Sequence, residues 1–297
     1  MINWKENILI KNSVEFSQGI YSTEFDQSLG LKFHEKMPKG AALRDLKDVH
    51  LHLAYWETPY YKKAIANFLD GVQNRAECIA LDVGCGDGRF TELLVELGFQ
   101  KIVATDIHLT PLISLRNYAE KHGFSDKLIL IQCSADKIPI QDGVAGVILA
   151  IGVYYYLNDR FENCLQEAYR ILQPNGTLIN SEPDLEGAVY KSLFFEEVDD
   201  ALENLKVRKF KEEKGHTDFK FRLFDQEEMK QMLTRNGFLN VDQHGLSLLP
   251  SILRIKMVRG EFPEETIHQH RNEIRRLFDC FDEMGRLYKH IIWKSFK

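Results

Sequence analysis

One short segment, residues 80–94, limits what this chain can fold into more than any other stretch. An apolar run over residues 78–83, with a carboxylate near its end at Asp82, has the pattern of a strand buried on both faces. Glycines then alternate with other residues, and apolar side chains recur at helical spacing up to a glycine suited to end a helix: Gly84, Gly86, Gly88, then Phe90, Leu93, Leu94, Leu97 and Gly98. A strand, a glycine turn and a helix in this order present backbone N–H groups and a helix N-terminus to a ligand. We therefore predict a cofactor-binding turn.

The spacing of the glycines separates this turn from two other nucleotide-binding turns. The dinucleotide fingerprint Gly-x-Gly-x-x-Gly would need a third glycine at position 89, which is Arg89. A phosphate-binding loop would end in Gly-Lys followed by Ser or Thr, and the sequence has no such ending here. The pattern is instead Asp-x-Gly-x-Gly-x-Gly. A carboxylate at the strand end, Asp82, suits a cationic ligand better than a pyrophosphate.

A second carboxylate follows the next predicted strand. Residues 101–105 have the pattern of a buried strand, and Asp106 follows them, 24 residues beyond Asp82. A carboxylate in this place can accept both ribose hydroxyls of an adenosine. NAD enzymes use the same contact, so Asp106 indicates an adenosine ligand without choosing the cofactor. A helix N-cap carboxylate is the alternative interpretation.

The glycine turn and Asp82 resemble the first motif of the class I S-adenosylmethionine-dependent methyltransferases. In that family the acidic residue and the glycines hold the amino-acid end of the cofactor. The carboxylate after the second strand holds the ribose, and the next side chain lies against adenine. The resemblance implies S-adenosylmethionine as cofactor, S-adenosylhomocysteine as product, and contacts from Asp82, Gly84, Cys85, Gly86, Gly88, Asp106 and Ile107.

A second stretch resembles the same family. After a predicted third strand over residues 128–133 comes Ser-Ala-Asp-Lys-Ile-Pro, where the family has a carboxylate that meets the adenine amino group. Ala135 and Asp136 fill these positions. Ala150 and Ile151, at the end of the predicted fourth strand over residues 144–150, are implied as further cofactor contacts. One departure is Ala145-Gly146, where the family usually has Phe-Asp, so a common strand-capping carboxylate is missing.

The candidates for acid–base chemistry follow the fourth and fifth strands. In related small-molecule methyltransferases, such as those of quinone biosynthesis, two histidines often stand where this chain has Tyr155 and Tyr156. A tyrosine near a sulfonium offers a phenol oxygen or an electron-rich face. Glu182 and Asp184 follow the fifth strand and can face a substrate. DNA amino-methyltransferases carry Asn/Asp-Pro-Pro-Tyr after strand four, and Ala-Ile-Gly-Val here disfavours exocyclic amines of DNA bases.

The predicted fold is α/β: a Rossmann-like, seven-stranded, mostly parallel sheet of order 3-2-1-4-5-7-6 with helices on both faces and helical lid insertions. A turn at Pro174-Asn175-Gly176 separates a helix over residues 161–172 from a fifth strand at residues 177–180. The sixth and seventh strands are predicted at residues 238–248 and 288–296. One amphipathic helix over residues 189–205, a helix opened by a capping box at Asp225 and Glu228, and one long helix over residues 263–285 complete the prediction.

We divide the chain into an N-terminal extension or lid, residues 1–57, and a methyltransferase domain, residues 58–297, with insertions at about 185–223 and 250–286. Residues 1–50 are predicted to form irregular structure or short helices. This segment either covers the cofactor or packs along the outside of the domain. A helix is expected to begin at Thr58 as N-cap with Pro59 at its first position. Trp56, Tyr60 and Tyr61 are substrate-pocket candidates. His50 and His52 lack further ligands at a recognisable spacing, so no metal site is predicted.

The composition excludes several classes of partner. The net charge of −6 gives no bulk attraction to nucleic acid or to an anionic membrane. The longest apolar run, residues 144–153, is too short to cross a bilayer, and the first residues do not read as a signal peptide. Five cysteines without a CxxC pair favour reduced thiols and a cytoplasmic location.

The expected partner is a small-molecule methyl acceptor, because a polymer would need an open groove; the oligomeric state stays open. Transfer would be an in-line displacement, for which alignment and desolvation come first and a base is needed only if the nucleophile is protonated. The alternatives are a non-catalytic cofactor-binding partner subunit, an enzyme that uses the cofactor for another reaction, and, as a lesser one, an NAD-linked oxidoreductase.

Overall fold

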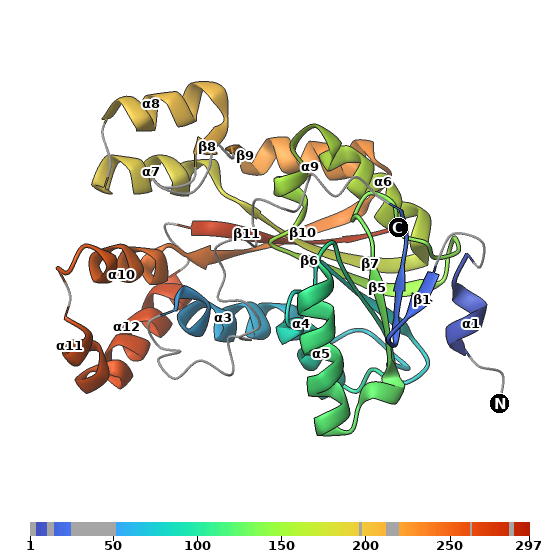
Figure 1. Ribbon diagram of the computed structural model, residues 1–297. Helices are drawn as coiled ribbons and strands as arrows, with labels where there is room; N and C mark the ends of the chain where they lie inside the picture. The colour runs from blue at the N-terminus through green and yellow to red at the C-terminus, as the bar shows by residue number, and fades with distance from the viewer. Residues whose placement is uncertain are drawn as a thin grey trace.

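The computed structural model describes residues 4–10, 15–24, 52–195, 198–211, 220–261, 263–284 and 288–297. Within these residues the chain forms a central sheet with helices on both faces (Figure 1). The sheet has nine strands in the order β1-β2-β5-β4-β3-β6-β7-β11-β10. Their bounds are β1 Glu15–Ser17, β2 Ile20–Ser22, β3 Ile79–Val83, β4 Lys101–Asp106, β5 Leu128–Gln132, β6 Ala145–Ile151, β7 Leu172–Pro183, β10 Leu239–Ser247 and β11 Tyr288–Phe296.

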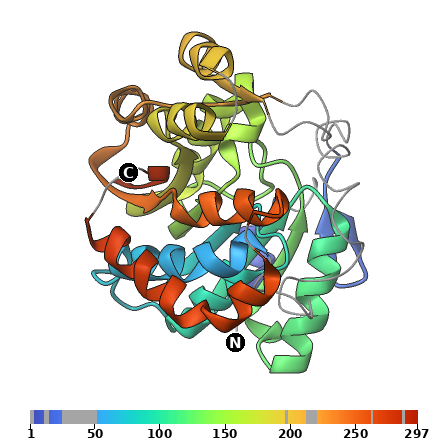
Figure 2. The same ribbon diagram turned by 90° about the vertical axis from the view of Figure 1, so that its left-hand side faces the viewer.

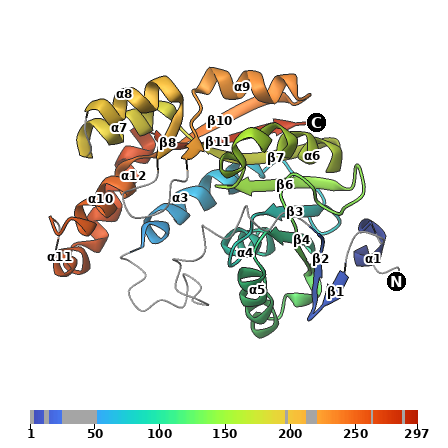
Figure 3. The same ribbon diagram turned by 45° about the horizontal axis from the view of Figure 1, so that its top comes forward.

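The predicted α/β class and the order 3-2-1-4-5-7-6 are confirmed by the seven strands from β5 to β10. Figure 3 shows β4, β3, β6, β7, β11 and β10 side by side. Parallel pairs join β5, β4, β3, β6 and β7. The last strand, β11, enters antiparallel between β7 and β10, with Ile291 opposite Glu182. The central strands are buried on both faces, as all seven residues of β6 show, so their sequences read as continuous apolar runs.

Two further strands extend the predicted sheet. β1 and β2 form a hairpin whose turn residues, Gln18 and Gly19, both have positive φ, and β2 pairs in parallel with β5. The expectation of irregular structure is therefore wrong for residues 15–22. Ile20 is buried in the core and Tyr21 packs against a second apolar cluster, whereas Phe16 is exposed; Arg116 also donates to the carbonyl oxygen of Gln18. Residues 25–51, which include His50, lie outside the described residues, so the predictions made for them stay predictions.

The helices divide into two layers that bury separate apolar clusters. One cluster lies under α3, α4, α5 and α10 to α12, and the other under α1, α6 and α9. The helices are α1 Trp4–Ile8, α3 Leu53–Phe68, α4 Arg89–Glu96, α5 Leu109–His122, α6 Phe161–Ile171, α7 Leu185–Phe195, α8 Val198–Val207, α9 Gln226–Arg235, α10 Leu249–Val258, α11 Glu264–Gln269 and α12 Arg271–Met284. Short 3-10 helices, η5 Ser125–Lys127 and η6 Tyr154–Arg160, and a separate pair of strands, β8 Lys209–Lys211 and β9 Lys220–Arg222, complete the described elements.

Three predicted elements are differently divided. The amphipathic helix over residues 189–205 is two helices, α7 and α8, which pack on each other through a hydrogen bond from Asn204 to Ser192. The long helix over residues 263–285 breaks at His270 into α11 and α12, and α10 precedes both. The turn predicted at residues 174–176 lies inside β7 as a bulge, where Asn175 has a φ of 63°. The capping box is confirmed, since the Asp225 carboxylate accepts from the backbone N–H of Glu228.

The predicted start of a helix at Thr58 and Pro59 is wrong, because α3 begins at Leu53 and carries Pro59 inside it. A proline at this position has no N–H for the carbonyl of Tyr55, four residues earlier. Arg275 of α12 takes that role: its guanidinium donates to the carbonyl oxygens of Tyr55 at 3.1 Å and Trp56 at 2.8 Å. The same guanidinium lies over the ring of Trp56. A contact between two helices thus supplies the hydrogen bond to the Tyr55 carbonyl that Pro59 cannot donate.

Arg275→Met is expected to lower the free energy of unfolding by about 1–3 kcal/mol, because it leaves helix carbonyls without their donor. In a Pro59→Ala background the same substitution should cost less, since the alanine has the backbone N–H that the carbonyl of Tyr55 otherwise lacks. Urea unfolding of the four proteins in this cycle measures the difference. Equal costs in both backgrounds would show that Arg275 acts only through its ring contacts.

Candidate functional site

The predicted cofactor turn lies where β3, β4, β6 and β7 end, at the carboxyl edge of the parallel strands. Gly84, Gly86 and Gly88 all have positive φ, of 65°, 53° and 89°. A Cβ on Gly84 would overlap the side chain of Val153, and one on Gly88 would overlap that of Leu115. A Cβ on Gly86 would meet no heavy atom within 4 Å. Two glycines therefore close the turn against its neighbours, and the middle one faces open space.

Asp106 connects this turn to the end of the second parallel strand. One oxygen of its carboxylate accepts from the backbone N–H of Gly86 at 2.9 Å, and the other accepts from that of His108 at 2.8 Å. The carboxylate holds the turn in place and lies beside the residue that faces open space. Each carboxylate oxygen has more than one acceptor site, so these contacts leave capacity for hydroxyl donors. The helix-capping contact to His108 and the predicted ribose contact are compatible.

Asp82 is deeper in the fold than the sequence suggests. It is 1% exposed, and the hydroxyl of Thr91 on α4 donates to it at 2.6 Å. Burial raises the pKa of Asp82 to about 7, and the hydrogen bond from Thr91 opposes that shift. A cation near this carboxylate would favour its ionised form.

Asp82 gives the stability a measurable pH dependence. Because its pKa is raised on folding from an ordinary 3.8 to about 7, the folded state holds a proton that the unfolded state releases, and stability falls as pH rises between these values. Asp82→Asn is expected to remove this loss. The difference in unfolding free energy between variant and wild type should grow with pH by up to about 1.4 kcal/mol per unit in that window. Glu182 and Asp184 have pKa shifts of the same sign but are unchanged in the variant, so the difference isolates Asp82. Chemical denaturation from pH 4 to pH 8 tests it, and parallel profiles would contradict it.

Asp136, the predicted adenine contact, is already paired. Arg160 of η6 lies 2.8 Å from one carboxylate oxygen, and the Ser134 hydroxyl donates to the other at 2.5 Å. Arg160 is a residue that the sequence reasoning missed. Ile107 and Ala135, the neighbouring predicted contacts, are half-buried, and Ala150 and Ile151 are buried at the end of β6.

A buried cluster joins three elements beside the turn. The Tyr61 hydroxyl of α3 lies 2.9 Å from Nδ1 of His290 at the start of β11. The Tyr155 ring stands edge-on to His290 at 5.7 Å and lies 4.2 Å from the Tyr156 ring. Burial is the main cause that lowers the pKa of His290 well below its usual value, so its imidazole is neutral and, with Nδ1 unprotonated, accepts a hydrogen bond from Tyr61. Burial raises the pKa of Tyr61 and of Tyr155, so both are neutral phenols.

Glu182 lies at the end of β7 and is 1% exposed. The amide of Asn180 donates to its Oε1 at 2.8 Å, while Oε2 has no hydrogen-bond partner within the described part of the chain. Burial raises the pKa of Glu182 well above its usual value. Burial therefore favours the protonated carboxyl, which can donate a hydrogen bond. Asp184 accepts from the N–H of Gly187 at the start of α7, and burial raises its pKa to about 6.

The three pocket candidates separate in the structure. Trp56 packs edge-on against Phe278 of α12, and the Tyr60 hydroxyl donates to Asp279 at 2.8 Å. Both side chains are buried in the contact between α3 and α12. Tyr61 alone of the three faces the cluster with His290 and Tyr155.

His290 was missed because its place depends on the sheet. It lies far from Tyr61 in sequence, and only the antiparallel insertion of β11 beside β7 brings it to the carboxyl edge, opposite Pro183. Ser181, which accepts from the N–H of Gly152 at 2.9 Å, was also missed; this contact comes from the parallel pairing of β6 with β7. The alternation of residues 288–296 predicted a strand but did not indicate its register against β7. No sequence signal could therefore place His290 beside Tyr61.

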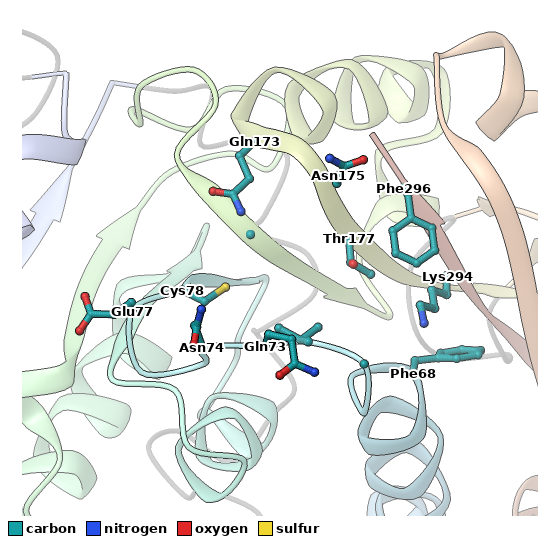
Figure 4. A pocket seen from close by; sticks show the side chains of 13 residues that line it. Phe68, Gln73, Asn74, Glu77, Cys78, Gln173, Asn175, Thr177, Lys294 and Phe296 are labelled. Carbon is teal, nitrogen blue, oxygen red and sulfur yellow. The ribbon is translucent and has the colours of Figure 1, made fainter.

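A cavity of about 510 Å³ lies at the other end of the sheet (Figure 4). Its walls carry Phe68, Asn74, Cys78, Gln173 and Lys294, from the end of α3, the loop before β3 and the near ends of β7 and β11. It contains none of the predicted site residues. The carboxyl edge, where the glycine turn and the buried cluster meet, is therefore the better candidate for the chemistry.

The described residues contain no group of three or more His, Cys, Asp or Glu side chains that could hold a metal ion. Across the same residues, none of the helices is both long and apolar enough to cross a membrane. All five cysteines are free.

Comparison with known proteins adds to this geometry. Residues 81–180 match a family described as a methyltransferase domain. By this match, residues 81–180 form a methyltransferase domain. The matched range runs from β3 through the glycine turn, Asp106 and the buried tyrosines to the middle of β7. It therefore contains all the predicted cofactor contacts, from Asp82 to Ile151.

The curated relatives of this domain include methyltransferases whose names refer to different substrates. A ubiquinone/menaquinone biosynthesis C-methyltransferase of Brucella anthropi is 26% identical, over 57% of this chain and 63% of its own length. A histone-arginine methyltransferase of Anopheles gambiae is 26% identical, over 48% of this chain and 23% of its own length. The chain thus spans less than two thirds of the length of the curated relatives it matches.

Solved structures show the same fold at lower identity. The cyclase SpnF is 16% identical, with a TM-score of 0.53 and 80% of each chain covered. Because this fold also serves a protein named as a cyclase, the likeness in structure does not by itself decide the reaction.

Proposed function

We propose that this chain binds S-adenosylmethionine at the carboxyl edge of the sheet and transfers its methyl group to a small-molecule acceptor. The observation that carries the proposal is the geometry around Gly86: it faces open space, and its N–H is held by the Asp106 carboxylate. The match of residues 81–180 to the methyltransferase domain supports it. The net charge of −6 and five free cysteines fit an acceptor that is not a nucleic acid and a reducing, cytoplasmic location.

The residues of the turn fit the cofactor. Gly86 leaves room for a ligand to approach the backbone, and Asp106 lies within hydrogen-bond distance of that backbone, where ribose hydroxyls would find an acceptor. The buried Asp82 offers negative charge to a sulfonium amino acid. When bound, S-adenosylmethionine supplies a methyl carbon activated by the sulfonium leaving group. In this proposal Asp136 stabilises the loop around adenine through Arg160 rather than by a direct contact.

The cluster beside the turn would orient the acceptor and hold its proton. The neutral His290 and the Tyr61 hydroxyl form one hydrogen-bonded pair, and Tyr155 lies against the same imidazole. The burial of all three residues excludes water from this wall. Glu182 is a second proton-bearing group, because burial favours its protonated form and its Oε2 has no hydrogen-bond partner within the described residues. Such buried groups suit a small acceptor better than a protein chain such as a histone.

Titration calorimetry with S-adenosylmethionine, S-adenosylhomocysteine and NAD tests the cofactor. We expect binding of the first two and no heat with NAD. Tight NAD binding without response to the other two would overturn the proposal. Binding of both adenosyl ligands without methyl transfer to any member of an acceptor panel that includes quinones and small amines would instead favour a non-catalytic subunit or another reaction.

Tyr155→Phe separates a chemical role from a packing role. If the hydroxyl helps to position the acceptor or its proton, the variant should lose about 10-fold or more in kcat, while its affinity for S-adenosylhomocysteine stays close to that of wild type. Tyr154→Phe is the matched control, because Tyr154 is buried in the same apolar cluster but packs edge-on against Phe161 of α6. Equal rates for all three proteins would assign Tyr155 to packing.

A further inference from the structure

The helical hairpin α7–α8 has its large apolar side chains on the outside. Between the two helices lie small or polar residues: Ser192, Ala201 and Asn204 are buried, and the Asn204 amide donates to the Ser192 hydroxyl at 2.9 Å. The exposed side chains are instead large and apolar, with exposed fractions of 40–67%: Tyr190, Leu193, Phe194, Val198, Leu202, Leu205 and Val207. Figures 1 and 2 show the hairpin, in yellow, at the margin of the molecule. This is the reverse of the usual order for helices in water.

These exposed residues form regular stripes. On α8, Val198, Leu202 and Leu205 follow each other at i, i+4 and i+7, and on α7 Tyr190, Leu193 and Phe194 follow at i, i+3 and i+4. Such spacing places each set on one side of its helix. A continuous apolar stripe on two neighbouring helices is the surface that one helical hairpin offers another in a four-helix arrangement. Contiguous exposed apolar surface of this kind marks an interaction site.

The charges beside the stripe indicate the occupant. Asp199 at the start of α8 and Lys206 near its end each lie one position beyond a stripe residue, seven residues apart. If α8 of a second copy packs antiparallel on this helix about a twofold axis near Leu202, Asp199 of each copy lies beside Lys206 of the other. The Asp199 and Lys206 positions of α8 are therefore complementary in charge across this axis, and the apolar stripe faces its own copy. The acidic residues Asp199 and Asp200 beside the patch disfavour an anionic membrane surface.

We propose that the α7–α8 hairpin is a homodimerisation surface, on which two copies of this chain pack α8 against α8 in antiparallel orientation. The interface would lie next to the candidate site, because α7 follows β7 directly after Glu182 and Asp184. The dimer would hold in place the element that leaves the carboxyl edge. The proposal does not depend on the methyl-transfer reaction.

Analytical ultracentrifugation of the full chain tests the surface. Wild type is expected to sediment as a dimer, at twice the chain mass of 34.5 kDa. Leu202→Glu and Phe194→Glu should each raise the dimer dissociation constant by about 30-fold or more, as expected of central interface residues. The matched controls are Leu239→Glu and Leu277→Glu, at positions 60% and 52% exposed outside the hairpin, which should leave the dimer intact. A monomeric wild type, or controls that dissociate equally, would overturn the proposal.

A charge exchange tests the antiparallel orientation. Asp199→Lys and Lys206→Asp should each weaken the homodimer, because like charges then face each other at both ends of the helix pair. An equal mixture of the two variants should form a heterodimer with affinity close to wild type, since every facing pair is again of opposite sign. All replaced side chains are exposed, and circular dichroism checks that each variant is folded. A mixture that stays as weak as its components would exclude this arrangement.

Discussion

Gly86→Ala is expected to yield a folded protein that has lost S-adenosylmethionine binding. A Cβ at this position meets no atom within 4 Å, so the folded chain accommodates it. The φ of 53° is tolerated by alanine at a cost of about 1–2 kcal/mol in unfolding free energy. The added methyl group would fill the space in which the proposal places the ligand, and we expect affinity to fall by about 100-fold or more, which is about 2.7 kcal/mol.

Gly84→Ala is the matched control for this experiment. Its Cβ would overlap the side chain of Val153, inside the protein, so this variant should lose stability. The companion change Val153→Ala should restore part of that stability. Thermal unfolding and calorimetry with S-adenosylhomocysteine distinguish the two effects. Normal affinity in Gly86→Ala would place the ligand elsewhere and remove the observation on which the proposed function depends.

Asp106→Ala is expected to weaken cofactor binding by about 1–3 kcal/mol, the cost of losing a charged hydrogen-bond partner. Two losses combine in this variant. The ribose loses its predicted acceptor, and the N–H groups of Gly86 and His108 lose theirs, so the turn is less firmly placed. Asp106→Asn, which keeps one carbonyl oxygen, should show an intermediate affinity.

Asp126→Ala is the control for Asp106, because Asp126 is an exposed carboxylate in η5, away from the glycine turn. Its affinity should match that of wild type. Calorimetry measures all three variants under the same conditions. Unchanged affinity in Asp106→Ala would remove Asp106 from the site and leave it as a helix-capping carboxylate.

The residues proposed to hold the cofactor could be grouped from the sequence because they are contiguous or tied to strand ends. Asp82 and the three glycines fall within seven positions of one strand-turn-helix unit, and Asp106 ends the next strand. The order of the parallel strands follows from the alternation of strands and helices and from the family resemblance. The side-chain partners of these carboxylates could not be predicted from the sequence. Asp82 accepts a hydrogen bond from Thr91 and Asp136 pairs with Arg160, and both contacts join separate elements.

The other half of the site depends on pairings between distant segments. Tyr61, Ser181 and His290 come from α3, β7 and β11, and their meeting requires the antiparallel register of β11 on β7. The start of α3 was mispredicted for a similar reason, since Pro59 is tolerated inside the helix only because Arg275 arrives from α12. The single helix expected over residues 189–205 became a hairpin whose apolar residues face outward.

The sequence by itself determined the strand-turn-helix unit, the seven sheet strands other than β1 and β2, and the carboxylates at strand ends, because these depend on local periodicity and on where glycine is needed. Only the tertiary structure decided which polar groups meet at the carboxyl edge, which carboxylates are buried and proton-bearing, and which apolar face stays uncovered. The physical reason is that burial and pairing are properties of two or more segments together, and periodicity along one segment carries no information about the register of another.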